Sequence, residues 1–251
     1  MKQNISAVII TKNEEKNISK CLAQLRWVDE VIIIDDFSAD GTQQYALECK
    51  NVKFYENKFI DFAAQRNFAA SRASFDWILS VDADEVVNGD LKEEILKVIE
   101  KNDFVGYKIP TKNFFCGRWM KYGGWYPNYH IRLFKKEAAA WRGATDEAVE
   151  VKGKIGFLKN PILHFGHNTF DEWHKKNIIY AGQKAEEEYE SGTRFSYVMF
   201  VLSPLTMFFK MYFLKMGFLD GLHGIKSTFL MCRYKALIWL KIRELEKQRG
   251  K

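Results

Sequence analysis

The first hundred residues of the chain alternate between short apolar runs and longer stretches with apolar residues at helical spacing. The runs have few polar interruptions and occupy residues 5–10, 31–34, 52–55 and 77–81. Such runs are typical of strands buried on both faces of a parallel sheet. Apolar residues three and four positions apart predict helices between them. The pattern therefore predicts a β-α-β-α-β-α-β order and a doubly wound, mostly parallel α/β sheet.

The remainder of the chain changes character twice. Residues 104–151 are rich in glycine and aromatic residues and contain short strand-like runs, whereas the pattern from Phe170 to the end is helical. We therefore divide the chain into an α/β half (1–100), a second half of the same domain (101–169) and a helical C-terminal region (170–251).

Polar residues follow three of the predicted strands. They are Thr11 to Glu14 after the first run, Asp35 and Asp36 after the second, and Asp82 to Glu85 after the fourth. In an open parallel sheet, ligands bind beyond the carboxyl ends of the strands. We therefore expect the three segments to line one crevice, with Asn13 also capping the helix that follows it.

The fourth run ends in Asp82, Ala83, Asp84 and Glu85, which brings three carboxylates together. Like-charge repulsion makes this costly unless a cation lies among them. Carboxylate oxygens suit Mg²⁺ or Mn²⁺, and such a metal usually also binds substrate phosphates. In the alternative interpretation, Asp84 and Glu85 cap a following helix and Asp82 is merely exposed.

Composition indicates a folded chain with an uneven charge distribution. Of the 251 residues, 47 % are hydrophobic and 28 % are charged, so a packed core is expected and global disorder is not. Residues 194–251 contain 11 Lys or Arg and 3 Asp or Glu, a net charge of +8, whereas residues 1–193 carry −2. The basic C-terminal region points to an anionic partner.

The cysteines and the N-terminus indicate a cytoplasmic protein. The four cysteines lie far apart with no C-x-x-C spacing, which is typical of reduced thiols rather than of a disulfide framework or a zinc site. The apolar run near the N-terminus has six residues, too few for the core of a signal peptide.

An uncharged stretch of 15 residues, Phe195 to Phe209, lies between Arg194 and Lys210. A spanning helix needs about 20 apolar residues, and Pro204 interrupts this stretch. Beyond it, Lys and Arg alternate with aromatic residues. These features predict helices that bind an anionic membrane surface peripherally, on its cytoplasmic face. The alternative is that they pack on the rest of the chain or on a partner subunit.

Three segments together resemble a known family. They are VIITKNE at 8–14, IDDFSADGT at 34–42 and LSVDADE at 79–85. In this order they resemble the successive signatures of the family 2 glycosyltransferases, which have the GT-A fold.

Further segments resemble one branch of that family, which contains lipopolysaccharide inner-core β-1,4-glucosyltransferases acting on heptose. They are QRNFA at 65–69, NFFCGRW at 113–119, GGWYP at 123–127, RLF at 132–134 and FLDG at 218–221. The resemblance covers nearly the whole chain.

The resemblance implies a site for a UDP-sugar donor in the first half of the chain. Its nucleotide-sugar-binding residues would be Thr11, Glu14, Asp35, Asp36, Arg66 and Asp82. In the family, the aspartates of the D-x-D motif, here Asp82 and Asp84, hold the ribose and a divalent metal, Mg²⁺ or Mn²⁺. A divalent cation suits the reaction because the departing UDP gains negative charge. Arg66 would assist near the phosphates, or, in the alternative, face solvent.

An inverting transfer also needs a base that takes the proton of the acceptor hydroxyl. Family members usually carry a His-Glu pair for this, with the Glu as base, whereas this chain has Asp146 and Glu147. The resemblance implies that Glu147 is the base. Asp146, which replaces the His, is the alternative catalytic residue.

Aromatic and basic residues are candidates for acceptor binding. Trp125 and Tyr126 follow two glycines and suit a loop on which sugar rings stack, with core packing as the alternative. Arg118 and Arg132 suit contact with a phosphorylated acceptor, or else belong to the solvated surface.

His164 and His167 form an H-x-x-H pair. On an extended segment they face different ways, and no third ligand for zinc is evident, which favours structural roles. An additional contact from His164 to the donor metal stays open.

The expected enzyme is an inverting, metal-dependent hexosyltransferase that moves a hexose, most simply glucose, from a UDP-sugar to heptose of the lipopolysaccharide core. Alternatives are transfer to another surface glycan or lipid-linked acceptor, and an inactive membrane-surface binding protein, against which the intact D-x-D motif counts. A sugar nucleotidyltransferase would need a glycine-rich phosphate loop that residues 11–14 lack. The expected partners are donor, glycan acceptor and an anionic membrane surface, with no nucleic acid and with homo-oligomers left open.

Overall fold

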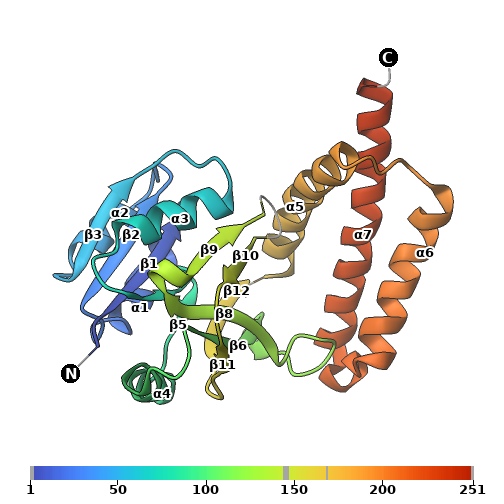
Figure 1. Cartoon of the computed structure of the whole chain (residues 1–251). Coiled ribbons are helices and arrows are strands. Elements are labelled where there is room, and N and C mark those ends of the chain that lie inside the picture. The colour runs from blue at the N-terminus through green and yellow to red at the C-terminus, as the bar shows by residue number, and fades with distance from the viewer. Residues whose placement is uncertain (1–2, 144–146, 168, 250–251) are drawn as a thin grey trace. The chain divides into compact units, whose positions relative to one another are not determined.

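The computed structural model describes residues 3–143, 147–167 and 169–249, and its N-terminal part alternates strands and helices (Figure 1). In chain order these are β1 (Ile5–Thr11), α1 (Glu15–Ala23), β2 (Glu30–Asp35), α2 (Thr42–Leu47), β3 (Val52–Glu56), α3 (Phe62–Arg72) and β4 (Trp77–Ser80). The predicted β-α-β-α-β-α-β order is confirmed, and the apolar runs differ from the strands by at most one residue at either end.

Short strands follow, and then long helices, as the sequence predicts. The strands are β5 (Glu85–Val86), β6 (Gly106–Phe115), β7 (Arg118–Trp119), β8 (Asn128–Lys135), β9 (Ala139–Arg142), β10 (Ala148–Val151), β11 (Ile155–Phe157) and β12 (Ile162–His167). The helices are α4 (Gly89–Lys101), α5 (Phe170–Glu190), α6 (Tyr197–Phe208) and α7 (Gly221–Arg249), with 3₁₀ turns at Lys136–Ala138 and Gly217–Asp220 and a π-helical segment at Phe209–Leu214.

The strands form one mixed sheet in the order β3-β2-β1-β4-β8-β6-β12-β5, while β9 and β10 form a separate antiparallel pair. β1 pairs in parallel with β2 and with β4, and β2 pairs in parallel with β3. β8 runs antiparallel to β4. Because these first four strands share one direction, their carboxyl ends meet at one edge, where Thr11 lies beside Asp35.

Helices cover both faces of this sheet, as two separate core clusters indicate. Ile9 of β1 belongs to one cluster together with Leu22 of α1, whereas the adjacent Val8 belongs to the other together with Ala69 of α3. Strand residues point alternately to the two faces, so a strand buried on both needs an unbroken apolar run. The doubly wound, mostly parallel arrangement is confirmed.

The helix α1 begins differently from the prediction. Its N-cap residue is Glu14, which makes no side-chain capping hydrogen bond. Asn13 instead has a positive φ of 54°, and its side-chain oxygen accepts from the backbone N–H of Ala39 at 2.9 Å. The prediction that Asn13 caps α1 is therefore wrong, because its side chain holds the loop after β2.

The helix after the acidic cluster begins beyond that cluster. α4 starts at Gly89 and is capped by Asn88, whose side chain accepts from the backbone N–H of Leu91 at 2.9 Å. Glu85 instead begins β5, which pairs with β12. The interpretation in which Asp84 and Glu85 cap a helix is therefore wrong.

The chain forms two compact units. The first contains residues 1–111 and 129–164, and the second contains residues 112–128 and 165–251. These ranges differ from the divisions at residues 100 and 169 because both β6 and β12 pass from one unit into the other. The parallel strands β1 to β4 and the acidic strand ends belong to the first unit.

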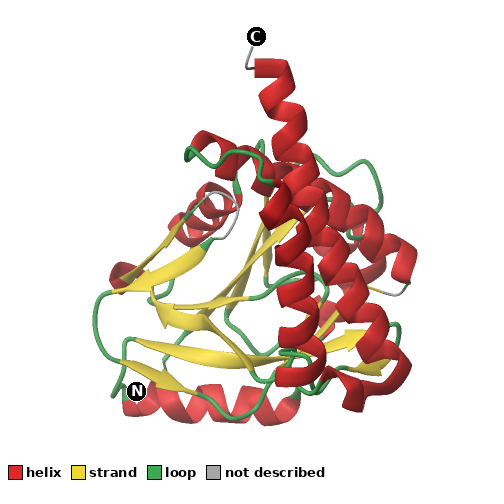
Figure 2. Ribbon diagram, turned by 90° about the vertical axis from the view of Figure 1, so that its right-hand side faces the viewer, coloured by secondary structure: helices red, strands yellow, loops and turns green. Residues whose placement is uncertain are grey.

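The second unit is built on its long helices. α5 and α7 pack through Ala181, Ala185, Ile238 and Ile242, which are all nearly inaccessible to solvent. α6 lies alongside α7 (Figures 1 and 2). The small alanine side chains let α5 and α7 approach closely, so the unit has a core of its own.

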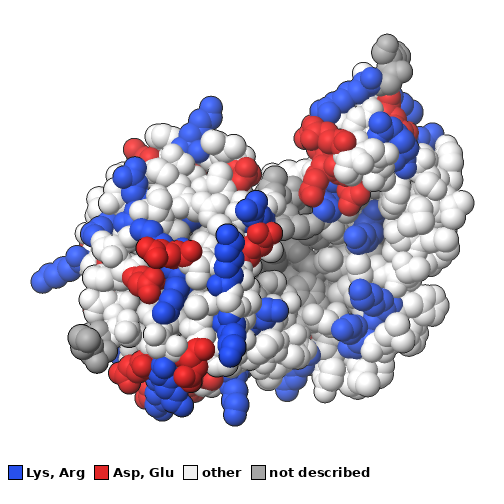
Figure 3. Space-filling model, in the orientation of Figure 1, with Lys and Arg blue, Asp and Glu red and all other residues white. Residues whose placement is uncertain are grey.

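The helical structure of α6 continues through the π-helical segment Phe209–Leu214. The 18-residue stretch Tyr197–Leu214 has a mean hydropathy of 1.5, and only 6 % of it is buried. Within the part of the chain that the structure describes, it is one helix with the length and composition to cross a membrane. The expectation that the stretch is too short to span a membrane is therefore corrected, because the helix continues past Lys210 to Leu214. Figure 3 shows an uncharged surface over α6.

Candidate active site

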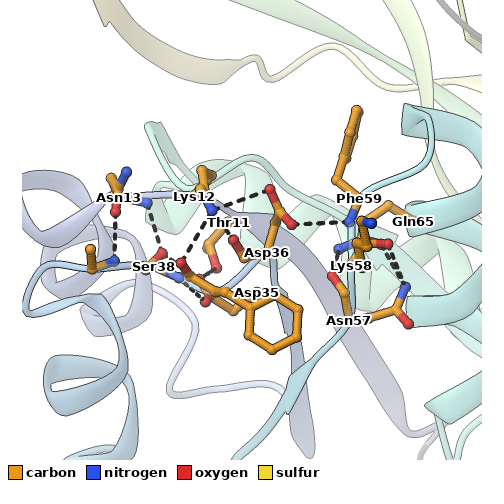
Figure 4. A network of polar contacts seen from close by, with 12 residues as sticks. Thr11, Lys12, Asn13, Asp35, Asp36, Ser38, Asn57, Lys58, Phe59 and Gln65 are labelled. Atoms are coloured by element: carbon orange, nitrogen blue, oxygen red, sulfur yellow. Dashed lines mark hydrogen bonds and ion pairs between the residues drawn. The ribbon is translucent and has the colours of Figure 1, made fainter.

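The carboxyl ends of β1 and β2 are joined by hydrogen bonds to Asp35, which is 1 % exposed (Figure 4). The hydroxyl of Thr11 donates to Asp35 Oδ1 at 2.8 Å. Ser38 donates from its hydroxyl to Oδ1 at 2.5 Å and from its backbone N–H to Oδ2 at 2.6 Å. Thr11 and Asp35 are therefore brought together as predicted, and Asp35 fixes the loop that follows β2.

Asp36 is a partly exposed carboxylate beside this cluster. Its Oδ1 accepts from the backbone N–H of Phe59 at 3.0 Å, and its Oδ2 lies 3.3 Å from Nζ of Lys12. The hydrogen bond from Phe59 and the charge of Lys12 lower the pKa of Asp36, against the opposing effect of burial. Lys12 also donates to the backbone carbonyls of Asp36 and Phe37. Asp36 is thus ionised at neutral pH.

Glu14 stands between this loop and α1. Its backbone N–H donates to the hydroxyl of Thr42 at 2.8 Å, which ties it to the start of α2. Its carboxylate accepts from the side-chain amide of Asn17 at 2.7 Å. Glu14 is half-buried, so a polar ligand at this edge of the sheet has access to part of its side chain.

Asp82, the first aspartate of the D-x-D motif, lies between two arginines. Its Oδ1 is 2.7 Å from Nη2 of Arg66, and its Oδ2 is 3.1 Å from Nη2 of Arg132. Burial alone would raise the pKa of Asp82, but the two guanidinium groups hold it well below its usual range. The neighbouring arginines therefore keep Asp82 ionised.

Glu85 is the most enclosed carboxylate of the acidic cluster, at 1 % exposure. It accepts from the backbone N–H of Asp82 at 2.8 Å and from Nη2 of Arg132 at 2.7 Å. Burial and the adjacent charge of Asp82 raise the pKa of Glu85, which Arg132 partly offsets. Glu85 and Arg132 thus hold the turn after β4, so that Asp82 and Asp84 keep fixed positions.

Asp84, the second aspartate of the motif, contacts His164 on β12, with 3.3 Å between Oδ2 and Nε2. Burial opposes a charged imidazole, but the hydrogen bond and charge of Asp84, with Glu85 and Asp82 beyond it, raise the pKa of His164. His164 therefore belongs to the acidic cluster, and its contact with a donor metal stays a prediction.

These side chains suit a divalent metal that also binds the phosphates of a ligand. Within residues 3–143, 147–167 and 169–249, no three His, Cys, Asp or Glu side chains are arranged to hold a metal by themselves. Mg²⁺ bound with phosphates is commonly held by one or two carboxylates and keeps other positions for phosphate oxygens and water. Asp84, with His164 next to it, supplies such a partial set, whereas both oxygens of Asp82 contact arginines.

The predicted base lies against the same arginine as the D-x-D motif. Glu147 Oε1 is 3.4 Å from Nε of Arg66, and the Glu147 side chain is 21 % exposed. Arg66 is itself buried and also donates to Ser80 Oγ at 3.2 Å, so the solvent-facing alternative for Arg66 is wrong. Asp146 lies outside the described residues.

The predicted acceptor residues fall into two groups. Arg132 belongs to the first unit and contacts Asp82 and Glu85, so it is part of the acidic cluster and not of the solvated surface. Trp125 and Tyr126 belong to the second unit. The ring of Trp125 packs edge-on against that of Trp173, and the ring of Tyr126 against that of Trp119, with 5.5 Å between ring centroids in both pairs.

In that unit, Arg118 is exposed at the start of β7. Trp125 is half-buried beside the cluster of Phe115, Met120 and Trp173, which fits the core-packing alternative at least in part. Sugar stacking by Trp125 and Tyr126 stays a prediction.

Sequence reasoning did not assign Ser38 and Ser80, which the structure places at this edge. Both lie inside the quoted signatures, so their positions close to Asp35 and Asp82 in the sequence were a usable signal. Glu85 and His164 were considered with the metal, but the contacts of Glu85 with Arg132 and of His164 with Asp84 depend on how β8 and β12 pair in the sheet.

Comparison with known proteins shows the family of this chain. A sequence profile of Glycosyl transferase family 2 matches residues 6–151. LpsC of Rhizobium meliloti, a lipopolysaccharide core biosynthesis glycosyltransferase, is 27 % identical, and the match covers 90 % of this chain and 89 % of LpsC. An uncharacterized glycosyltransferase of Rickettsia typhi is 26 % identical over 97 % of this chain and 88 % of its own.

Among solved structures, the crystal structure of S. aureus TarS 1–349 in complex with UDP has a TM-score of 0.53 at 15 % identity, covering 99 % of this chain and 92 % of TarS 1–349. This similarity bears on the fold, which is GT-A. The family profile spans more than half of the chain and contains both the Asp35 loop and the D-x-D motif. The chain is therefore a glycosyltransferase that belongs to glycosyl transferase family 2.

Proposed function

We propose that this glycosyltransferase moves a hexose, most simply glucose, from a UDP-sugar to a sugar of the lipopolysaccharide core, with inversion at the anomeric carbon and with Mg²⁺ or Mn²⁺ as cofactor. The observation that carries the proposal is the chain of contacts from the D-x-D motif through Arg66 to Glu147. It joins the predicted donor residues to the predicted base. The relationship to LpsC supports the acceptor class, and the TarS complexes with UDP and UDP-GlcNAc support the donor class.

The edge formed by β1 and β2 suits a nucleoside. Asp36 keeps a charged, partly exposed carboxylate that accepts from N–H or ribose hydroxyl groups. The Asp35 carboxylate already accepts hydrogen bonds from Thr11 and Ser38, so Asp35 would hold the loop after β2 in the conformation that binds the ligand. Uracil and ribose offer the donors that such acceptors need.

The D-x-D side of the edge suits the diphosphate. When bound, a divalent cation would offset the negative charge that develops on the departing UDP. Asp84 is the residue of this chain best placed to hold it, with His164 adjacent. Arg66 and Arg132 add two fixed positive charges, which stabilise a diphosphate beside the carboxylates.

Glu147 would act as the general base. The acceptor hydroxyl oxygen forms a bond to the anomeric carbon while the bond from that carbon to the diphosphate oxygen breaks. The hydroxyl proton passes to the Glu147 carboxylate and the electron pair leaves with UDP. Contact with Arg66 orients one oxygen of the Glu147 carboxylate, which leaves the other to accept the proton.

Two other functions compete with this one. Transfer to a different surface glycan or lipid-linked acceptor uses the same donor chemistry, and the acceptor alone distinguishes it. An inactive membrane-surface binding protein would have no need for an intact D-x-D motif contacted by two arginines. Family membership and this motif both favour the enzyme.

The test is UDP release from purified protein. UDP-glucose, UDP-galactose and UDP-GlcNAc are each combined with lipopolysaccharides truncated at successive core sugars, with Mn²⁺ or with EDTA. We expect metal-dependent UDP release that requires a heptose-terminated acceptor and is fastest with UDP-glucose. Release with another surface glycan but with no core acceptor would replace the proposed acceptor. Failure with every donor would contradict the donor class.

A further inference from the structure

The helix α6 and the π-helical segment after it present an exposed apolar face. Val198, Leu202, Leu205, Phe209 and Phe213 recur every three or four residues and are 46–64 % exposed. This spacing places them on one side of the helix, and we refer to these five residues as the apolar face. Soluble proteins rarely expose contiguous apolar surface on this scale unless it binds something.

The apolar surface continues around the turn into α7. Leu214, Met216 and Leu222 are 78 %, 51 % and 74 % exposed. Phe229 on α7 is 59 % exposed and packs against Phe208 of α6, with 5.8 Å between ring centroids. The exposed surface therefore spans two helices and their connection, which is more than one side chain left out of a core.

Within residues 195–240 the exposed charged side chains are all positive. Between residues 195 and 240 the acidic side chain is Asp220, which is 3 % exposed and accepts from the backbone N–H groups of Lys121 and Tyr122. The basic side chains of the same range are Lys210, Lys215, Lys226, Arg233 and Lys235. Residues 195–240 thus combine apolar side chains with cations and offer no exposed carboxylate.

Three lysines also line a cavity between α5, α6 and α7. It has a volume of about 560 Å³, and its lining includes Lys184, Lys210 and Lys235 as well as apolar side chains such as Met199 and Trp239. Glu188, which also lines it, offsets one of the three charges. Cations next to apolar side chains suit a phospholipid, because the cations contact its phosphate and the apolar side chains contact its acyl chains.

We propose that the apolar face binds the surface of an anionic lipid bilayer, with α6 lying in the plane of the interface. The apolar side chains enter the boundary between headgroups and acyl chains, and the flanking lysines contact lipid phosphates. The proposal rests on the second unit alone and does not depend on the transferase function.

Two other occupants fit less well. If α6 spanned the bilayer, α7 beside it would bring Lys226, Arg233 and Lys235 toward the hydrocarbon, which is unfavourable. In a two-fold dimer, the apolar face of one copy would contact the apolar face of the other, because a two-fold interface is self-complementary. The cations of both copies would then face one another without carboxylates from residues 195–240 to neutralise them.

The test is flotation of the full chain with lipid vesicles. One set is pure phosphatidylcholine, and the other is equal parts phosphatidylcholine and phosphatidylglycerol. We expect binding to the anionic vesicles at low salt, release at high salt, and much weaker binding to the neutral set. Lys210→Gln should lower the partition coefficient on anionic vesicles about fivefold.

A matched pair of variants isolates the apolar face. Leu205→Gln with Phe209→Gln removes two of its exposed side chains and should lower the partition coefficient about tenfold or more. Leu47→Gln with Phe157→Gln changes the same residue types at 58 % and 62 % exposure in the first unit and should leave it unchanged. Circular dichroism melting should give the same midpoint for both variants and the wild type.

Several results would overturn the proposal. Equal flotation of the two double variants would show that the apolar face is not the contact. A dimer in light scattering that Leu205→Gln with Phe209→Gln dissociates would assign the face to a second copy. A fall in melting midpoint for that variant alone would show that the face is buried in solution. Retention on vesicles after an alkaline carbonate wash would indicate a spanning helix.

Discussion

The two ends of the parallel sheet hold their carboxylates in opposite ways. At the amino end, Glu30 is 4 % exposed and accepts from the hydroxyl of Ser6 at 2.6 Å and from Nζ of Lys53 at 2.6 Å, with further bonds from Ser74. At the carboxyl end, several carboxylates of the described residues gather around a few basic side chains. The carboxylates are Asp35, Asp36, Asp82, Asp84, Glu85 and Glu147, and the basic partners include Lys12, Arg66, Arg132 and His164.

This difference separates a structural carboxylate from a binding one. The charge of Glu30 is met by donors of the chain itself, so its network is complete without a ligand. At the carboxyl end, the charge of Asp82 repels that of Glu85, which helps to raise the pKa of Glu85 and costs stability. A ligand that brings a divalent cation removes that cost, so changes at the two ends should affect different measurements.

The largest effect is expected for Asp84→Asn. The substitution keeps the shape of the side chain and removes the carboxylate best placed to hold the metal, so transfer should fall about 10²–10³-fold. Stability should change little, since relief of repulsion within the acidic cluster offsets the lost charge interaction with His164. Initial rates of UDP release and urea unfolding measure the two effects. Asp90→Asn, an exposed acid nearby on α4, is the control and should change neither. An active Asp84→Asn enzyme would refute the metal assignment.

A smaller loss is expected for Glu147→Gln. A neutral amide cannot take the acceptor proton, so the turnover number should fall about 10²-fold while UDP affinity stays the same. Glu150→Gln, three residues further on and paired with Arg142 at the surface, should leave both unchanged. Asp146→Asn provides the decisive comparison. If it does the greater damage and Glu147→Gln stays active, the base is Asp146.

At the opposite end of the sheet, Glu30→Gln should leave the transfer rate unchanged and lower the free energy of unfolding by about 2 kcal/mol. The reason is that an amide fails to satisfy the buried donors of Ser6 and Ser74 and no longer pairs with Lys53. Glu93→Gln breaks an exposed ion pair with Lys97 and should cost far less. Urea titrations compare the two variants. A transfer defect in Glu30→Gln would mean that the two ends are not independent.

The smallest expected effect is the pH dependence of the stability that Glu30 contributes to the fold. Burial opposes the charge of Glu30, but its hydrogen bonds from Lys53, Ser6 and Ser74 lower its pKa below the ordinary value of 4.5. A carboxyl group with a lowered pKa in the folded state stabilises the fold fully above its ordinary pKa. This stabilisation is lost as the pH falls through the folded-state pKa. The gap in unfolding free energy between wild type and Glu30→Gln should therefore shrink below pH 4.5. A gap that grows toward acid would contradict the network.

The sequence predicted the parts of this edge that depend on local pattern. Unbroken apolar runs located β1 to β4, and the polar residues that end them placed Asp35 and Asp82 correctly. The sequence did not predict contacts between side chains that lie far apart along the chain. Arg132 was assigned to the acceptor because nothing in its neighbourhood reveals that β8 pairs with β4 and brings it to Asp82. Asn13 was assigned to a helix cap because the competing hydrogen bond from Ala39 comes from another loop.

The most direct test of the carboxyl-end site is the affinity of UDP with and without a divalent cation. Calorimetric titration of UDP into the wild type should show binding at least about tenfold tighter with Mn²⁺ than with EDTA, because the cation joins the diphosphate to the acidic cluster. Asp84→Asn should lose this difference, and Glu30→Gln should keep it. Equal UDP affinity of the wild type in Mn²⁺ and in EDTA would contradict the account.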